Sequence, residues 1–146
     1  MKRNSGTILW FILAIGSFVL CFLINLNASL FGYGVNIFNI ASSVEYILVW
    51  ILLLVFNRSN GKSLMLSIIF ALITLIAALL GACTIFLDFS FWGLSFLAIP
   101  ILTPLYGLTG IFSKFEITYP VMILLSGIWF GISVRMRFSL QKSEKV

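Results

Sequence analysis

The sequence predicts an all-α integral membrane protein with four transmembrane helices, both termini in the cytoplasm, and a proline-broken re-entrant or half-helix segment before the last helix. Apolar residues (A, V, I, L, M, F, W, Y and C) make up 62% of the 146 residues, and only nine Lys or Arg and four Asp or Glu are present. Soluble domains are about 25% charged, so this scarcity of charge excludes a soluble fold. The apolar residues also gather in long uncharged runs, as spanning helices require.

Four of these runs can cross the hydrocarbon core of a bilayer, which is about 30 Å thick and needs about 20 helical residues. They cover residues 7–24, 37–56, 64–87 and 117–134, and the chain is expected to form a single membrane domain with a basic tail at 135–146. The second run is compactly apolar only from Val44 to Phe56. Its helix must therefore begin near Ile37, which places Glu45 close to the middle of the membrane.

The segment 89–113 is uncharged and long enough to span, but it contains Pro100 and Pro104. Each proline lacks an amide N–H and disfavours helix in the residue before it, so we expect a re-entrant hairpin or two half-helices. A single kinked span, giving five spans in total, is the alternative.

The distribution of cations favours four spans. With five spans the cations divide five to four between the two sides of the membrane. With four spans they divide eight to one, and the positive-inside rule places the larger group and both termini in the cytoplasm. That group is Lys2, Arg3, Arg58, Lys62, Arg135, Arg137, Lys142 and Lys145, against Lys114 outside.

Small residues recur at helical spacing in two of the runs. They are Ser67, Ala71, Thr74 and Ala78 in the third run and the GxxxG pair Gly127 and Gly131 in the last. Such spacing places small side chains on one helix face, where they allow close approach of another helix in lipid. Both sets are expected to be helix-packing seams, with a ligand groove as the alternative for the third run.

Glu45 marks the candidate site. An ionisable residue within a span costs about 2.5–3.5 kcal/mol on insertion scales and by default indicates a polar cavity, a charge pair or a proton relay. The sequence therefore suggests an outward-facing polar pocket around Glu45, formed with Asn39, Ser42 and Ser43 and edged by Asp88, Lys114 and Glu116. Alternatively, the helix begins nearer Ala41 and Glu45 is an interfacial acid or pairs with Lys114.

The sequence offers no set of residues for known catalytic chemistry. It has no histidine and no G-x-S-x-G, HExxH or Walker-type glycine motif, and its two cysteines, Cys21 and Cys83, lie inside apolar runs. We therefore predict no metal, no cofactor and no catalytic residue. The absence of a basic face interleaved with aromatic residues argues against nucleic-acid binding.

Three functions remain for a protein of the cell membrane. The first is non-enzymatic contact with another membrane protein or with itself, as an accessory subunit of a transporter or export complex or as an immunity or sensing factor. The second is a small oligomeric transporter or channel that uses Glu45. The third is a lipid-directed enzyme that uses the outer acids. The lack of a soluble domain and of catalytic residue sets favours the first.

Overall fold

Four long helices form the protein in the computed structural model, which describes residues 3–31, 33–87 and 98–143. They are α1 (Arg3–Phe31), α2 (Ile37–Phe56), α3 (Gly61–Phe86) and α6 (Phe115–Ser143). All four are long and apolar enough to cross a membrane, and the described residues contain no strand. The prediction of an all-α membrane protein with four spanning helices is therefore confirmed.

A shorter apolar helical segment, Ala98–Phe112, precedes α6. It begins as α-helix over 98–102, continues as the 3-10 helix η1 (Thr103–Leu108), and ends as α5 (Thr109–Phe112). It is too short to cross a core of about 30 Å, so the described part of the expected segment 89–113 is not a fifth span. Residues 89–97 of that segment lie outside the described residues.

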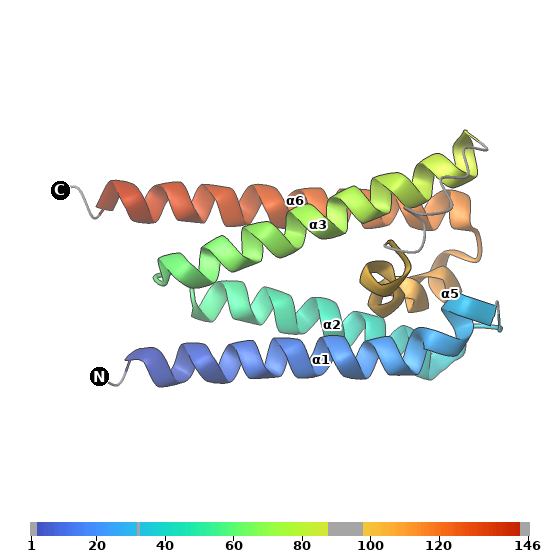
Figure 1. Cartoon of the computed structure of the whole chain (residues 1–146), viewed down its shortest axis with the longest axis horizontal. Helices are drawn as coiled ribbons and strands as arrows, with labels where there is room; N and C mark the ends of the chain where they lie inside the picture. Colours follow the sequence, from blue (N-terminus) through green and yellow to red (C-terminus); the bar gives the residue numbers. More distant parts are fainter. Residues whose placement is uncertain (1–2, 32, 88–97, 144–146) are drawn as a thin grey trace.

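The helices run alternately up and down. The start of α1, the turn between α2 and α3, and the end of α6 lie at one end of the bundle, and the segment Ala98–Phe112 lies toward the other (Figure 1). At the first end lie Arg3 at the start of α1, Arg58 in the turn after α2, Lys62 in the first turn of α3, and Arg135, Arg137 and Lys142 toward the end of α6, whereas Lys114 immediately precedes α6 at the opposite end. Positive charge is thus segregated to one end of the bundle.

The bounds of α2 follow from its cap. The Asn36 side chain accepts hydrogen bonds from the amides of Phe38 and Asn39, and the Asn39 side chain accepts one from the Asn36 amide. This reciprocal capping box satisfies amides that the first helical turn leaves without partners. Helix α2 therefore begins at Ile37, the residue from which the expected span also starts.

Two helices extend beyond the expected spans. Helix α1 continues past Ile24 to Phe31 and so includes Asn25 and Asn27, which the sequence placed at the end of the run. Helix α6 continues past Val134 to Ser143, so most of the basic tail is helical. A helix need not end where its apolar run ends, because its backbone hydrogen bonds continue wherever polar side chains are satisfied.

The small-residue stripe of α3 lies in the most extensive interface of the fold, between α3 and α6. Its members Ser67, Ala71, Thr74 and Ala78 are buried. The Ser67 hydroxyl oxygen lies 3.1 Å from that of Ser133 and accepts a 2.9 Å hydrogen bond from Nε1 of Trp129. By contrast, no neighbouring atom lies within 4 Å of where a Cβ would stand on Gly127 or Gly131, so the GxxxG pair is not part of this packing.

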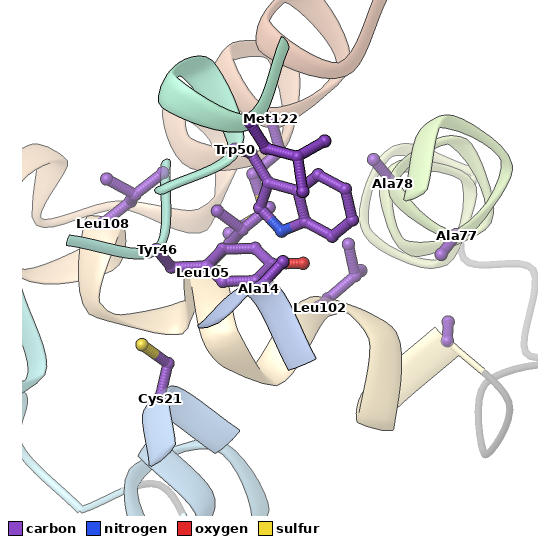
Figure 2. Packing of buried hydrophobic residues seen from close by; sticks show 12 residues of the cluster. Ala14, Cys21, Tyr46, Trp50, Ala77, Ala78, Leu102, Leu105, Leu108 and Met122 are labelled. Atoms are coloured by element: carbon purple, nitrogen blue, oxygen red, sulfur yellow. The ribbon is translucent and has the colours of Figure 1, made fainter. Parts of the chain in front are cut away.

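The core lies where the segment Ala98–Phe112 inserts between the helix pairs α1–α2 and α3–α6. Figure 2 shows Tyr46 and Trp50 of α2 gathered with Leu102 and Leu105 of this segment. Ala14 and Cys21 of α1, alanines of α3 and Met122 of α6 also belong to the cluster. The segment Ala98–Phe112 therefore fills the interior of the bundle.

Candidate functional site

Polar side chains line the interface between α1 and α2. On α1, Ser17, Cys21, Asn25 and Ser29 recur every four residues, so they share one helix face. On α2, this interface is built from Asn39, Ser42 and Ser43, all buried, and from Glu45 at its edge. We call this set of eight residues the polar seam.

The two helices are joined by hydrogen bonds in the seam. Nδ2 of Asn25 donates to the Cys21 carbonyl oxygen and to the Ser42 hydroxyl, each at 3.0 Å. Nδ2 of Asn39 donates to the Ile24 carbonyl oxygen at 2.9 Å. Buried polar groups are tolerated in a membrane interior when they find such partners, and Nδ2 of Asn25 has them, whereas Oδ1 of Asn25 is buried without a hydrogen-bond partner among the described residues.

The polar seam also holds the segment Ala98–Phe112 in place. The Ser43 hydroxyl donates to the Pro104 carbonyl oxygen at 2.7 Å and accepts from the Gly107 amide at 3.0 Å. The hydroxyl groups of Ser29 and Thr103 lie 3.1 Å apart. Backbone that departs from regular α-helix is tolerated at membrane depth only where protein satisfies its polar groups, and α1 and α2 supply those partners here.

Glu45 lies at the edge of the seam with its side chain exposed. Its Oε2 accepts a 3.0 Å hydrogen bond from the Ser17 hydroxyl and lies 3.3 Å from Sγ of Cys21. The neighbouring exposed residues of α2, Val44 and Leu48, are apolar. The carboxyl group is therefore anchored to α1 and also open toward the surroundings of the bundle, about 16 Å from the Phe56 end of α2.

The residues expected to form an outer pocket lie in three different surroundings. Asn39, Ser42 and Ser43 lie together in the filled interior. Lys114 and Glu116 border a shallow hollow at the end of the bundle with Ile85 and Phe115. Glu45 lines neither this hollow nor the two others found in the described residues, one beside the segment Ala98–Phe112 and one between α2 and α6. Asp88 lies outside the described residues.

A second hollow, of about 100 Å³, lies beside the inserted segment. The residues that line it include five that carry a hydroxyl group, from α1, α3, η1 and α6: Ser29, Thr84, Thr103, Tyr106 and Tyr119. Its volume suits a few water molecules, since each occupies about 30 Å³ in the liquid.

The chemistry of the seam is hydrogen bonding by hydroxyls, amides, one thiol and one carboxyl group. In the described ranges no cluster of three His, Cys, Asp or Glu residues could hold a metal ion, and Cys21 and Cys83 are unpaired thiols. No protein-family model, curated protein or solved structure matches this chain.

Sequence reasoning missed the α1 half of the seam. Cys21 was noted only as lying inside an apolar run, Asn25 fell just past the first expected span, and Ser17, Ser29 and Thr103 were not singled out. A signal was present, because Ser17, Cys21, Asn25 and Ser29 are spaced by four. That period indicates one helix face that runs past Ile24.

Proposed function

We propose that this protein works by contact within the cell membrane, as an accessory subunit of a transporter or export complex or as an immunity or sensing factor. The exposed carboxyl group of Glu45 carries the proposal. Glu45 is the ninth residue of α2 and lies on a face whose other exposed members, including Val44, Leu48 and Leu52, suit lipid. A carboxyl group in that position is stabilised most by a hydrogen-bond donor or a cation on another membrane helix.

The filled interior supports contact over conduction by a single copy. The segment Ala98–Phe112 packs between the helix pairs, and the two hollows beside it have volumes of only about 100 Å³ and 180 Å³. Of the eight residues of the polar seam, only Ser29 lines one of these spaces; the hydrogen bonds of the other seven lie within the helix interfaces. The part of the fold best suited to an external partner is thus the outer face of α2.

The cation distribution supports an orientation with both termini in the cytoplasm and the segment Ala98–Phe112 entering from the outer face. We expect a cysteine introduced at Lys114 to react with a membrane-impermeant maleimide added to intact cells. A cysteine at Lys142 should react only after the cells are opened. The unsubstituted protein, with Cys21 and Cys83 in place, is the control. Labelling at Lys142 from outside would contradict the orientation.

A photo-crosslinking residue at Leu48, one turn from Glu45 on the same exposed face, should capture a second membrane protein. The same residue at Leu72, exposed on α3, should capture much less. Glu45→Gln should reduce the Leu48 product about 5- to 30-fold, because an interhelical polar contact is worth about 1–2 kcal/mol in model helices. Equal capture at Leu48 and Leu72, unaffected by Glu45→Gln, would contradict the proposal.

The same experiment separates the second candidate function, an oligomeric transporter or channel. The exposure of Glu45 also suits an interface between copies, where several carboxyl groups face a shared pathway. Capture at Leu48 of another copy of this chain, instead of a different protein, would favour that function. Measurement of ion flux in proteoliposomes containing the cross-linked oligomer would then be the next test.

A further inference from the structure

An apolar groove runs along the surface between α2 and α6, on a different face of α2 from Glu45. Its volume is about 180 Å³. Trp50 and Leu54 form the α2 wall, Ile128, Trp129 and Ile132 form the α6 wall, and Leu105 of η1 contributes at one end. The groove exists because α2 packs mainly on α1 and η1 while α6 packs mainly on α3, which leaves the two pairs apart.

Aromatic rings close the inner side of the groove. The ring centroids of Trp50 and Trp129 lie 4.7 Å apart, and Phe70 stacks on Trp50 at 4.9 Å. Toward the surroundings the groove is bordered by Ile128 and Ile132, which are 51% and 46% exposed. The groove is therefore a narrow apolar slot with an opening toward lipid.

Cations lie just beyond one end of the slot. Arg135 is exposed and follows Ile132 by three residues, so it continues the helix face that Ile128 and Ile132 share. Arg58 is also exposed and follows the last residue of α2 by two. Both lie at the end of the bundle where positive charge gathers, and α6 extends past the end of α2 there (Figure 1).

We propose that the groove binds one acyl chain of an anionic phospholipid, with its phosphate at Arg58 and Arg135. A slot of this volume is too small for a partner helix, whose diameter with side chains is about 10–12 Å, but its aromatic and aliphatic walls suit part of one hydrocarbon chain. The two arginines complement the negative headgroup at the level where the chain leaves the groove. Each arginine near the surface should favour the anionic lipid about fivefold.

Tryptophan quenching by brominated lipids tests this proposal, because bromine on the acyl chain quenches only nearby indoles. With Trp10 and Trp92 replaced by Phe, the emission comes from Trp50 and Trp129 alone. The protein in phosphatidylcholine vesicles should be quenched more by a small fraction of brominated phosphatidylglycerol than by the same fraction of brominated phosphatidylcholine. Arg58→Gln with Arg135→Gln should remove most of this preference.

Filling the groove provides the matched control. Ile51 of α2 also lines the groove. Ile51→Phe with Ile128→Phe should protect the two indoles from both lipids, whereas Leu72→Phe, on an exposed face of α3, should not. Equal quenching by the two lipids would overturn the anionic headgroup site. Quenching that is unaffected by groove filling would overturn the groove as the binding place. A second protein that co-purifies with the chain and shields both indoles until it is removed would also overturn the proposal.

Discussion

Replacing Gly107 with alanine is expected to destabilise the protein by about 3 kcal/mol, because the new methyl group overlaps backbone atoms that cannot move away. A Cβ on Gly107 would collide with the carbonyl group of Asn39 on α2 and crowd the Ser43 hydroxyl. The Gly107 amide also donates to that hydroxyl at 3.0 Å. The segment Ala98–Phe112 and α2 would have to move apart, which would weaken the hydrogen bonds that Ser43 makes with Pro104 and Gly107.

Gly127→Ala is the matched control, since no neighbouring atom lies within 4 Å of the position of its Cβ. Alanine is favoured over glycine in a helix by about 0.8–1.0 kcal/mol, so this variant should be unchanged or slightly more stable. The measurement is the midpoint of unfolding by added sodium dodecyl sulfate in mild detergent. Equal midpoints for the two alanine variants would show that η1 does not approach α2 this closely.

Ser43→Ala is expected to destabilise the protein by about 2 kcal/mol, since it removes two buried hydrogen bonds between α2 and η1. The Ser43 hydroxyl connects the Pro104 carbonyl oxygen and the Gly107 amide, and the side chain is fully buried. Ser43 therefore links the segment Ala98–Phe112 to α2.

Ser42→Ala gives the comparison for Ser43→Ala. Ser42 is the adjacent residue, of the same type and also buried, but its hydroxyl donates within its own helix, to the Asn39 carbonyl oxygen at 2.9 Å. Its loss should cost less, because Asn25 keeps its bond to the Cys21 carbonyl oxygen. A smaller effect from Ser43→Ala than from Ser42→Ala would contradict the role of Ser43 as the anchor of η1.

The number and identity of the long helices followed from sequence because insertion into lipid depends on hydrophobicity summed over about 20 residues, a property of the chain alone. The end of α1 did not follow, because Asn25 resembles a loop residue until its partners on α2 are known. The end of α6 did not follow either, because Arg135 and later residues leave the apolar run without interrupting the helix.

For the candidate site too, the sequence predicted one part and the tertiary structure decided the other. The sequence placed Glu45 near the middle of α2 from the length that the helix needs, and in the structure it is the ninth of 20 residues. The face on which it lies depends on what surrounds α2. Helix α1 and η1 cover the side that carries Asn39, Ser42 and Ser43, which leaves Glu45 at the boundary with its Oε2 bonded to Ser17.

The sequence by itself determined a membrane protein of four long helices, a proline-interrupted segment and a carboxyl group at mid-depth in the second helix, because each depends on residue type and spacing along one helix. Only the tertiary structure decided that the interrupted segment fills the interior, that Cys21 and Asn25 join the seam, and that Glu45 points outward. These features depend on which faces of separate helices meet, and polar partners from distant parts of the chain select that arrangement.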